Sequence, residues 1–271
     1  MQGLTNLTKQ FASVNPNIVD RDSIMDLIYL TLQKKAKPNV LLLGSSGAGK
    51  TAIVEQLAYN IANKICPDAL YGFSIYKLEI GAFMAGDGYR GVLEKKVMEM
   101  IEGVLKSKTI IFADEFHTIE TAGKMANGST PGLGDTLKQY LTLPNFRMIG
   151  ATTYREFGEI KDAALLRRFI KINVSEISTE ALVKAIRNSF LRFIGEAQIT
   201  VDPDLVMELA RIAETHEHRI DFAVDMVDLV VAYARQEKMD HIDTNTAFKV
   251  IAMFEAVSLQ PTVADEATVF S

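Results

Sequence analysis

The feature that most constrains this chain is a glycine-rich run between a strand-like segment and a helical pattern. An apolar segment, 40–43, leads into it, and apolar residues recur at helical spacing from 53 to 61. The run itself reads Gly44, Ser45, Ser46, Gly47, Ala48, Gly49, Lys50 and Thr51. Such a loop, placed at a helix N-terminus, turns backbone N–H groups toward phosphates. Lys50 would add a positive charge there and the Thr51 hydroxyl would bind Mg²⁺, so the run predicts a nucleotide site.

The first half of the chain alternates short apolar runs with helical patterns, which is typical of a parallel sheet wrapped by helices. Further buried-strand candidates are 74–80, 109–112, 147–151 and 170–174. After about residue 175 the patterns are helical only, with helix starts expected at Ser178 or Thr179, Asp202-Pro203, Asp221 and about Thr244. We expect an α/β P-loop domain with three αβα layers over 1–175, a small helical domain over 176–258, and a flexible tail over 259–271.

The composition limits the partners and the cellular compartment that we expect for this chain. The formal net charge is −5, which argues against binding nucleic acid through bulk charge and leaves a local basic site open. No apolar run reaches the ~18 residues that span a bilayer, and no signal peptide is visible at the N-terminus. The single cysteine, Cys66, suits a reducing compartment. We therefore expect a cytoplasmic protein without a membrane partner.

Two carboxylates follow the apolar run 109–113. Asp114 and Glu115 would lie at the carboxyl edge of the sheet, where ligands gather in such folds. Asp114 would hold the Mg²⁺ shell, and Glu115 would orient and polarise the attacking water. The alternative is a solvated acidic pair at a strand end. Because a complete phosphate loop precedes the pair, the sequence favours a hydrolysis site.

Two further signals fit hydrolysis. Thr152 and Thr153 follow the strand candidate 147–151, so one hydroxyl can reach the γ-phosphate or the water. Arg167 and Arg168 are adjacent cations that can stabilise charge on a transferring phosphoryl group, an effect of about 10³–10⁵ in rate when a neighbouring subunit supplies it. The alternative for the arginines is a solvated basic pair.

With these motifs in place, the chain resembles the first ATPase module of the Clp/Hsp100 protein unfoldases, in the AAA+ superfamily. The segment 15–22 is similar to the family's adenine-cupping segment, with Ile18 and Val19 as the apolar contacts and Asp20 where a glycine is usual. The phosphate loop continues into Ala52 as in the family. The segments 114–118, 150–153 and 161–169 resemble its Walker B, sensor-1 and arginine-finger segments, and the resemblance selects Thr153 as the sensor. It implies ATP and Mg²⁺ as cofactors and a homo-oligomer that forms a ring of six subunits.

The segment 81–91 resembles the family's first pore loop, in which an aromatic residue grips a polypeptide. Tyr89 stands at that position, and Gly88 replaces a usual lysine. A flat ring with a polar tip can hold many side chains without choosing among them; the alternative is a loop tyrosine that packs on its own domain. The segment 121–133 would be the second pore loop. The resemblance thus implies a protein substrate, with room for an unidentified adaptor.

The chain also departs from the family. It carries one ATPase module, and we find no adaptor domain, no coiled-coil insertion and no protease-docking loop, so the sequence does not support a proteolytic partner. Our leading hypothesis is a ring ATPase that remodels or threads a protein substrate. Two alternatives stay open: an AAA+ module acting in DNA transactions, such as a loader, and an ATP-switched assembly scaffold.

Overall fold

The structure is a computed structural model that describes residues 3–84, 90–122, 132–195 and 197–258. The chain divides into two compact units, Met1–Glu176 and Ile177–Ser271. None of the described helices is long and apolar enough to cross a membrane.

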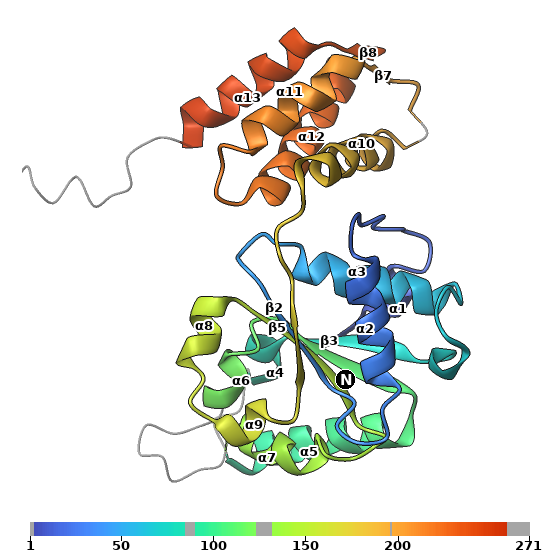
Figure 1. The fold of residues 1–271 in the computed structure, drawn as a ribbon, viewed down its shortest axis with the longest axis vertical. Coiled ribbons are helices and arrows are strands. Elements are labelled where there is room, and N and C mark those ends of the chain that lie inside the picture. Colours follow the sequence, from blue (N-terminus) through green and yellow to red (C-terminus); the bar gives the residue numbers. More distant parts are fainter. Residues whose placement is uncertain (1–2, 85–89, 123–131, 196, 259–271) are drawn as a thin grey trace, which may run out of the picture. The chain divides into compact units, whose positions relative to one another are not determined.

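Unit 1 consists of a sheet with helices on both of its faces (Figure 1). Its elements in chain order are β1 Leu4–Asn6, α1 Leu7–Gln10, α2 Asp22–Leu32, β2 Val40–Leu43, α3 Lys50–Ala62, a 3₁₀ turn Asp68–Leu70, β3 Ser74–Leu78, α4 Ile80–Met84, α5 Arg90–Lys106, β4 Thr109–Ala113, α6 Thr118–Thr121, α7 Leu133–Tyr140, β5 Arg147–Thr152, α8 Tyr154–Glu159, α9 Ala163–Leu166 and β6 Ile170–Asn173.

Among the described residues, six strands form this sheet in the order β1-β3-β4-β5-β2-β6. The five strands predicted from apolar runs are all present and pair in parallel, with Leu41 opposite Gly150 and Lys77 opposite Phe112. The sheet also has an antiparallel edge strand, β1, which pairs with β3. Because β1 has three residues, it is too short for a period-2 pattern to predict it.

Successive side chains of β2 point to opposite faces of the sheet, and each face is covered by a layer of helices. Val40 and Leu42 belong to the apolar core beneath α1, α2 and α3. Leu41 and Leu43 point to the other face and join the core formed with α5, α6 and α7. All four side chains are buried, as expected for a central strand of a parallel sheet covered on both faces. The predicted α/β fold with a mostly parallel sheet is confirmed.

Unit 2 is mainly helical: α10 Thr179–Ile194, β7 Thr200–Val201, α11 Pro203–Ala213, α12 Arg219–Gln236, β8 His241–Ile242 and α13 Thr244–Ser258. Ser178 caps α10 by accepting a hydrogen bond from the N–H of Ala181, and Asp202 caps α11. The prediction that Asp221 caps a helix is wrong, because α12 begins at Arg219, two residues before Asp221. Asp221 lies in the first turn of α12, where the helix dipole stabilises a carboxylate.

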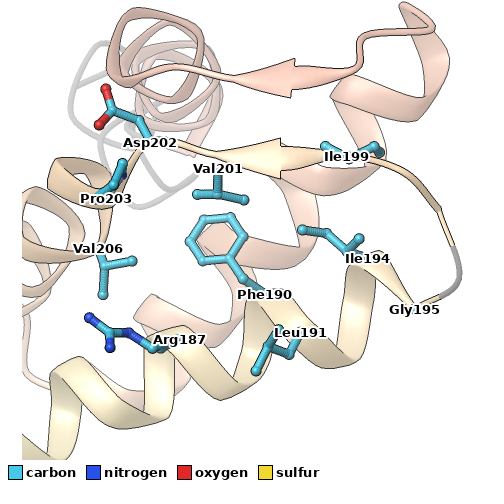
Figure 2. Close-up of a pocket in the computed structure, with 10 residues that line it drawn as sticks. All are labelled: Arg187, Phe190, Leu191, Ile194, Gly195, Ile199, Val201, Asp202, Pro203 and Val206. Carbon is cyan, nitrogen blue, oxygen red and sulfur yellow. The ribbon is translucent and has the colours of Figure 1, made fainter.

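An open groove of about 470 Å³ lies along α10 in unit 2, between that helix and the segment that leads through β7 into α11 (Figure 2). Its lining is mostly apolar, with Phe190 directed from α10 toward Val201 of β7. Arg187 stands at one end of the groove. Leu191 on the same helix is 69% exposed, so the helix presents apolar surface outside the core.

Candidate nucleotide-binding site

The phosphate loop joins β2 to α3, and its backbone needs the glycines it has. Gly47 and Gly49 have φ of +71° and +83°, in the left-handed region that glycine enters without steric cost. A Cβ on Gly44 would lie 2.5 Å from the carbonyl oxygen of Val174, so the loop starts where the backbones approach too closely for a side chain. The remaining residues predicted to contact the nucleotide here lie in the loop or on the first turn of α3: Ser45, Ser46, Ala48, Lys50, Thr51 and Ala52.

The two loop residues with assigned chemistry are both engaged. Lys50 Nζ donates to the carbonyl oxygens of Gly44 and Ser45 at 3.1 and 2.8 Å, so its ammonium lies over the mouth of the loop. Thr51 Oγ1 donates to Asp114 Oδ2 at 3.0 Å. The hydroxyl and the carboxylate that the sequence assigned to one metal ion therefore meet, although 63 residues separate them.

Glu115, the predicted water-activating residue, directly follows Asp114 and is exposed at the edge of the sheet. Its φ is +50°, an uncommon value for a residue with a side chain. The next residue is hydrogen-bonded to the sheet: the Phe116 N–H donates to the carbonyl oxygen of Ala151 on β5 at 2.8 Å. This turn presents the Glu115 carboxylate beside Asp114 and leaves it accessible.

The two threonines after β5 have different surroundings. Thr152 is 2% exposed, and its hydroxyl donates to Glu156 Oε2 at 3.1 Å. Thr153, the predicted sensor, is half-buried and caps α8: its Oγ1 accepts from the N–H of Glu156, and Glu156 Oε2 accepts from the N–H of Thr153. The side chain of Thr153 is thus held in place at the carboxyl end of β5.

Glu156 and His117 are residues of this region that the sequence interpretation missed. Glu156 Oε2 lies 3.3 Å from His117 Nδ1. Burial acts to raise the pKa of Glu156, but hydrogen bonds from Thr153 and Thr152 and the nearby His117 outweigh it and hold the pKa below its usual range. The signal was available, since Thr153-x-x-Glu156 has the spacing of a capping box.

The structure separates the two adjacent arginines after α9. Arg168 is bound inside its own unit: its Nε donates to the carbonyl oxygen of Lys138 at 2.6 Å, and its guanidinium also donates to the carbonyl oxygen of Ala164. Arg167 is exposed, and its guanidinium makes no hydrogen bond or ion pair with a described residue, although its backbone N–H donates to the carbonyl oxygen of Ala163 at the end of α9. Of the pair, Arg167 is the cation that is available to a group outside this chain.

One aromatic ring connects these segments. Phe116 lies against Gly150 of β5, where a Cβ would come within 2.6 Å of the ring. The same ring packs edge-to-face on Phe169, with centroids 4.8 Å apart. Phe169 directly follows Arg167 and Arg168, so the ends of β4 and β5 and the arginine segment share one packing contact.

The predicted adenine segment lies against α3 and the phosphate loop. The Ile18 N–H donates to Gln56 Oε1 at 3.2 Å, and both Ile18 and Val19 are half-buried. Asp20 has φ of +52°, which explains why a glycine suits this position. The buried Arg21 donates to the carbonyl oxygens of Ala48 in the loop, at 3.1 Å, and of Ser175, at 2.8 Å. Burial lowers the pKa of Arg21, with Asp20 acting in the opposite direction.

Tyr89, the predicted substrate contact, lies outside the described residues, as does most of the expected second pore loop, 121–133. The structure therefore describes the nucleotide site but not the predicted polypeptide grip.

Comparison with known proteins agrees with this geometry. Residues 40–176 match the model of the ATPase family associated with various cellular activities (AAA). The chain is 38% identical over 240 residues to the chaperone protein ClpB of Tropheryma whipplei strain TW08/27, covering 86% of this chain and 34% of that protein. It is 36% identical over 242 residues to ClpB of Lactiplantibacillus plantarum, covering 86% and 28%. The chain thus spans about a third of the length of these relatives.

Solved structures give the same assignment. An extended Hsp104:casein complex from S. cerevisiae superposes with a TM-score of 0.79 and 25% identity, covering 95% of this chain and 45% of that one. A closed-state Hsp104:ATPγS complex with FITC casein also gives 0.79, covering 97% and 46%. The chain is an ATPase module that resembles a nucleotide-binding domain of ClpB and Hsp104, and it belongs to the AAA family of ATPases.

Proposed function

We propose that this chain binds ATP with Mg²⁺, assembles into a homo-oligomeric ring, and uses hydrolysis to remodel or thread a protein substrate. The observation that carries the proposal is the 3.0 Å contact between Thr51 Oγ1 and Asp114 Oδ2, with Glu115 next in the chain. This contact supports the proposal because it lies at the carboxyl edge of the sheet, next to the phosphate loop, where α/β folds bind ligands.

The residues present fit the implied metal ion. Mg²⁺ prefers oxygen ligands and is usually held by one or two carboxylates together with substrate phosphates. Thr51 and Asp114 supply a hydroxyl and a carboxylate that already converge. Mg²⁺ would neutralise charge on the phosphates. Lys50 would bind the phosphates, Glu115 would orient and deprotonate the water, and Thr153 would help to position it.

The arginines support an oligomeric site. A cation that stabilises the phosphoryl group must approach it, and Arg167 is exposed at the end of α9 without a described partner in its own chain. We assign Arg167 to the nucleotide of a neighbouring subunit. Arg168 carries the same prediction from sequence, but its bonds to the Lys138 and Ala164 carbonyls suit it to holding the segment in shape.

The substrate class rests on the relatives. The superposed Hsp104 structures hold casein, and Tyr89 matches the aromatic residue of a polypeptide-gripping loop in the Clp/Hsp100 family. We therefore propose an unfolded or extended polypeptide as the substrate and Tyr89 as its contact. The chain spans about a third of its ClpB relatives, so this assignment concerns the work of one module.

The test is Glu115→Gln, which removes the base and keeps the shape of the side chain. ATP turnover should fall about 10²–10⁴-fold, the usual contribution of a positioned general base. Binding of ATP should be retained, because Lys50 and the loop are unchanged. In ATP the variant should also elute as a ring and retain fluorescent casein, measured by gel filtration together with steady-state hydrolysis.

Glu99→Gln on α5 is the matched control, because Glu99 is an exposed carboxylate outside the site; it should hydrolyse ATP at the wild-type rate. Full turnover by Glu115→Gln contradicts the assignment of Glu115. A Glu115→Gln protein that binds ATP but stays monomeric would contradict the proposed ring. One that releases casein would contradict the proposed polypeptide substrate.

A further inference from the structure

A lysine lies beside the metal-binding carboxylate, on the strand next to it. Lys77 belongs to β3 and pairs with Phe112 of β4, two residues before Asp114. Its Nζ lies 3.9 Å from Asp114 Oδ2 and 3.8 Å from Glu79 Oε1. The Lys77 and Asp114 side chains are 29% and 31% exposed, so the pair is partly shielded from solvent.

The oxygen that Lys77 approaches is the one bonded to Thr51. Asp114 Oδ2 accepts a hydrogen bond from the Thr51 hydroxyl at 3.0 Å and lies 3.9 Å from the Lys77 ammonium. A divalent cation that binds Thr51 Oγ1 and Asp114 Oδ2 would share this oxygen with Lys77. Two cations that approach one oxygen repel each other, and the repulsion is stronger near a protein surface than in bulk water.

The surroundings give this lysine two possible partners. Lys77, Glu79, Asp114, Glu115 and Thr118 line a polar cavity of about 250 Å³ at the carboxyl ends of β3 and β4. Among the described lining residues there are three carboxylates and one ammonium, so the charge of Lys77 offsets part of their negative charge. If a metal ion binds Asp114, the Lys77 ammonium still has Glu79 as a partner, with Oε1 at 3.8 Å.

We propose that Lys77 is a positioning residue that acts as the resident counter-cation of Asp114. Without metal, its charge holds Asp114 toward Thr51 and reduces the repulsion between the carboxylates and the nucleotide phosphates. With metal, it competes for Asp114 Oδ2 and weakens Mg²⁺ binding. Lys77 therefore lowers the dependence of nucleotide binding on Mg²⁺. The inference rests on the proposed role of Asp114 in the metal site.

The test compares the affinity for a fluorescent ADP analogue in MgCl₂ and in EDTA. The quantity is the ratio of the two dissociation constants, EDTA over Mg²⁺, for wild type, Lys77→Met and Lys77→Arg. In Lys77→Met the ratio should rise roughly three- to tenfold, because metal-free binding weakens while metal-dependent binding strengthens. Lys77→Arg keeps the charge and should stay within about twofold of wild type.

A double-mutant cycle with Asp114→Asn completes the experiment. In the Asp114→Asn background, Lys77→Met should leave the ratio unchanged. The inference is overturned if Lys77→Met alone leaves the ratio unchanged, or if both Lys77 variants lose affinity equally in both solutions, as a purely structural role would produce. If wild type and Asp114→Asn show the same ratio, Asp114 does not bind the metal ion. That outcome contradicts the proposed metal site itself and is read from variants in which Lys77 is unchanged.

Discussion

At the scale of single residues, the site depends on a position that must lack a side chain. Gly150 lies in the middle of the sheet, and a Cβ there would come within 2.6–2.8 Å of the Phe116 ring and 2.9 Å of Leu41 Cδ1. Phe116 has little room to retreat, since it is 1% exposed and packs on Phe169. The absence of a side chain at Gly150 therefore makes room for the Phe116 ring. This ring packs between the turn that carries Glu115 and the segment that carries the arginines.

Gly150→Ala should consequently lower the free energy of unfolding by about 1–3 kcal/mol, the usual cost of overpacking a core. ATP turnover should fall by more than the change in folded fraction, because the displaced ring disturbs the positions of Glu115 and Arg167 together. Urea unfolding and steady-state hydrolysis on the same samples measure the two effects. Adding Phe116→Leu should recover part of the turnover, and a double variant no better than Gly150→Ala would contradict the role of the ring.

Sequence reasoning named the candidate residues of the site but not the contacts that position them. The phosphate loop, Asp114 and Glu115 were visible because motif spacing encodes them directly. The departure at Asp20 was visible as well, but its φ of +52° was not. The proximity of Lys77 to Asp114 depends on which strands are neighbours, and spacing along the chain does not specify strand order.

At the scale of elements, α7 fixes the segment that carries the arginines. Lys138 on α7 pairs with Asp162 Oδ2 at 2.6 Å and with Asp135 Oδ1 at 2.7 Å. Asp162 also caps α9 by accepting from the Leu165 N–H at 2.9 Å. The Lys138 carbonyl in turn accepts from Arg168 Nε. One residue of α7 therefore holds both ends of the short helix α9.

This clamp depends on pH in a defined direction. The hydrogen bond from Lys138 is the largest cause that holds the pKa of Asp162 below its usual range, and bonds to Asp135 and Asp162 raise the pKa of Lys138. A carboxyl with a depressed pKa contributes stability above its unfolded pKa of about 3.9 and loses it as the pH falls through the lower folded value. The lysine contributes below about pH 10.4 and loses its contribution as the pH rises through its higher folded pKa.

Two substitutions separate the ion pair from the cap. Asp162→Asn keeps a good capping group and removes the charge, so it should cost about 0.5–1 kcal/mol at pH 7. Asp162→Ala should cost about 1 kcal/mol more, because it also removes the cap. The gap between wild type and Asp162→Asn should close below about pH 4, as urea unfolding at several pH values would show. A gap that stays constant down to pH 2 would contradict the ion pair.

The parallel strands were predicted from their apolar runs, and the shortest strands were not predicted. The five parallel strands of 4–6 residues were found from their apolar runs. β1, β7 and β8 have two or three residues each, so they carry no readable period. The start of α12 was misplaced because its N-cap, His218, makes no side-chain capping bond and so leaves no capping signal.

At the scale of the whole molecule, the proposed site is complete only when a second chain supplies Arg167. Mixing two inactive variants tests this directly. Arg167→Ala keeps Glu115, and Glu115→Gln keeps Arg167. In an evenly mixed ring, roughly a quarter of the interfaces pair an intact Glu115 with an intact Arg167 by chance.

The mixture should therefore hydrolyse ATP at roughly a quarter of the wild-type rate, while each variant alone stays near background. Hydrolysis is measured after the two proteins have exchanged subunits. A mixture no more active than its components would show that Arg167 acts on the nucleotide of its own chain. The mixture of Arg168→Ala with Glu115→Gln provides the comparison, because Arg168 is bonded within its own unit and its loss should be rescued less.

The bonds made by Arg21 have a mechanical consequence. Ser175 stands two residues before Ile177, the first residue of unit 2, and its carbonyl shares one buried guanidinium with the phosphate loop. Beyond the boundary, the Ile177 carbonyl is held at 2.5 Å by Arg219 of unit 2. Within unit 1, the last residues before the boundary are therefore anchored to the phosphate loop. A displacement of Ser175 would act through Arg21 on the backbone of Ala48.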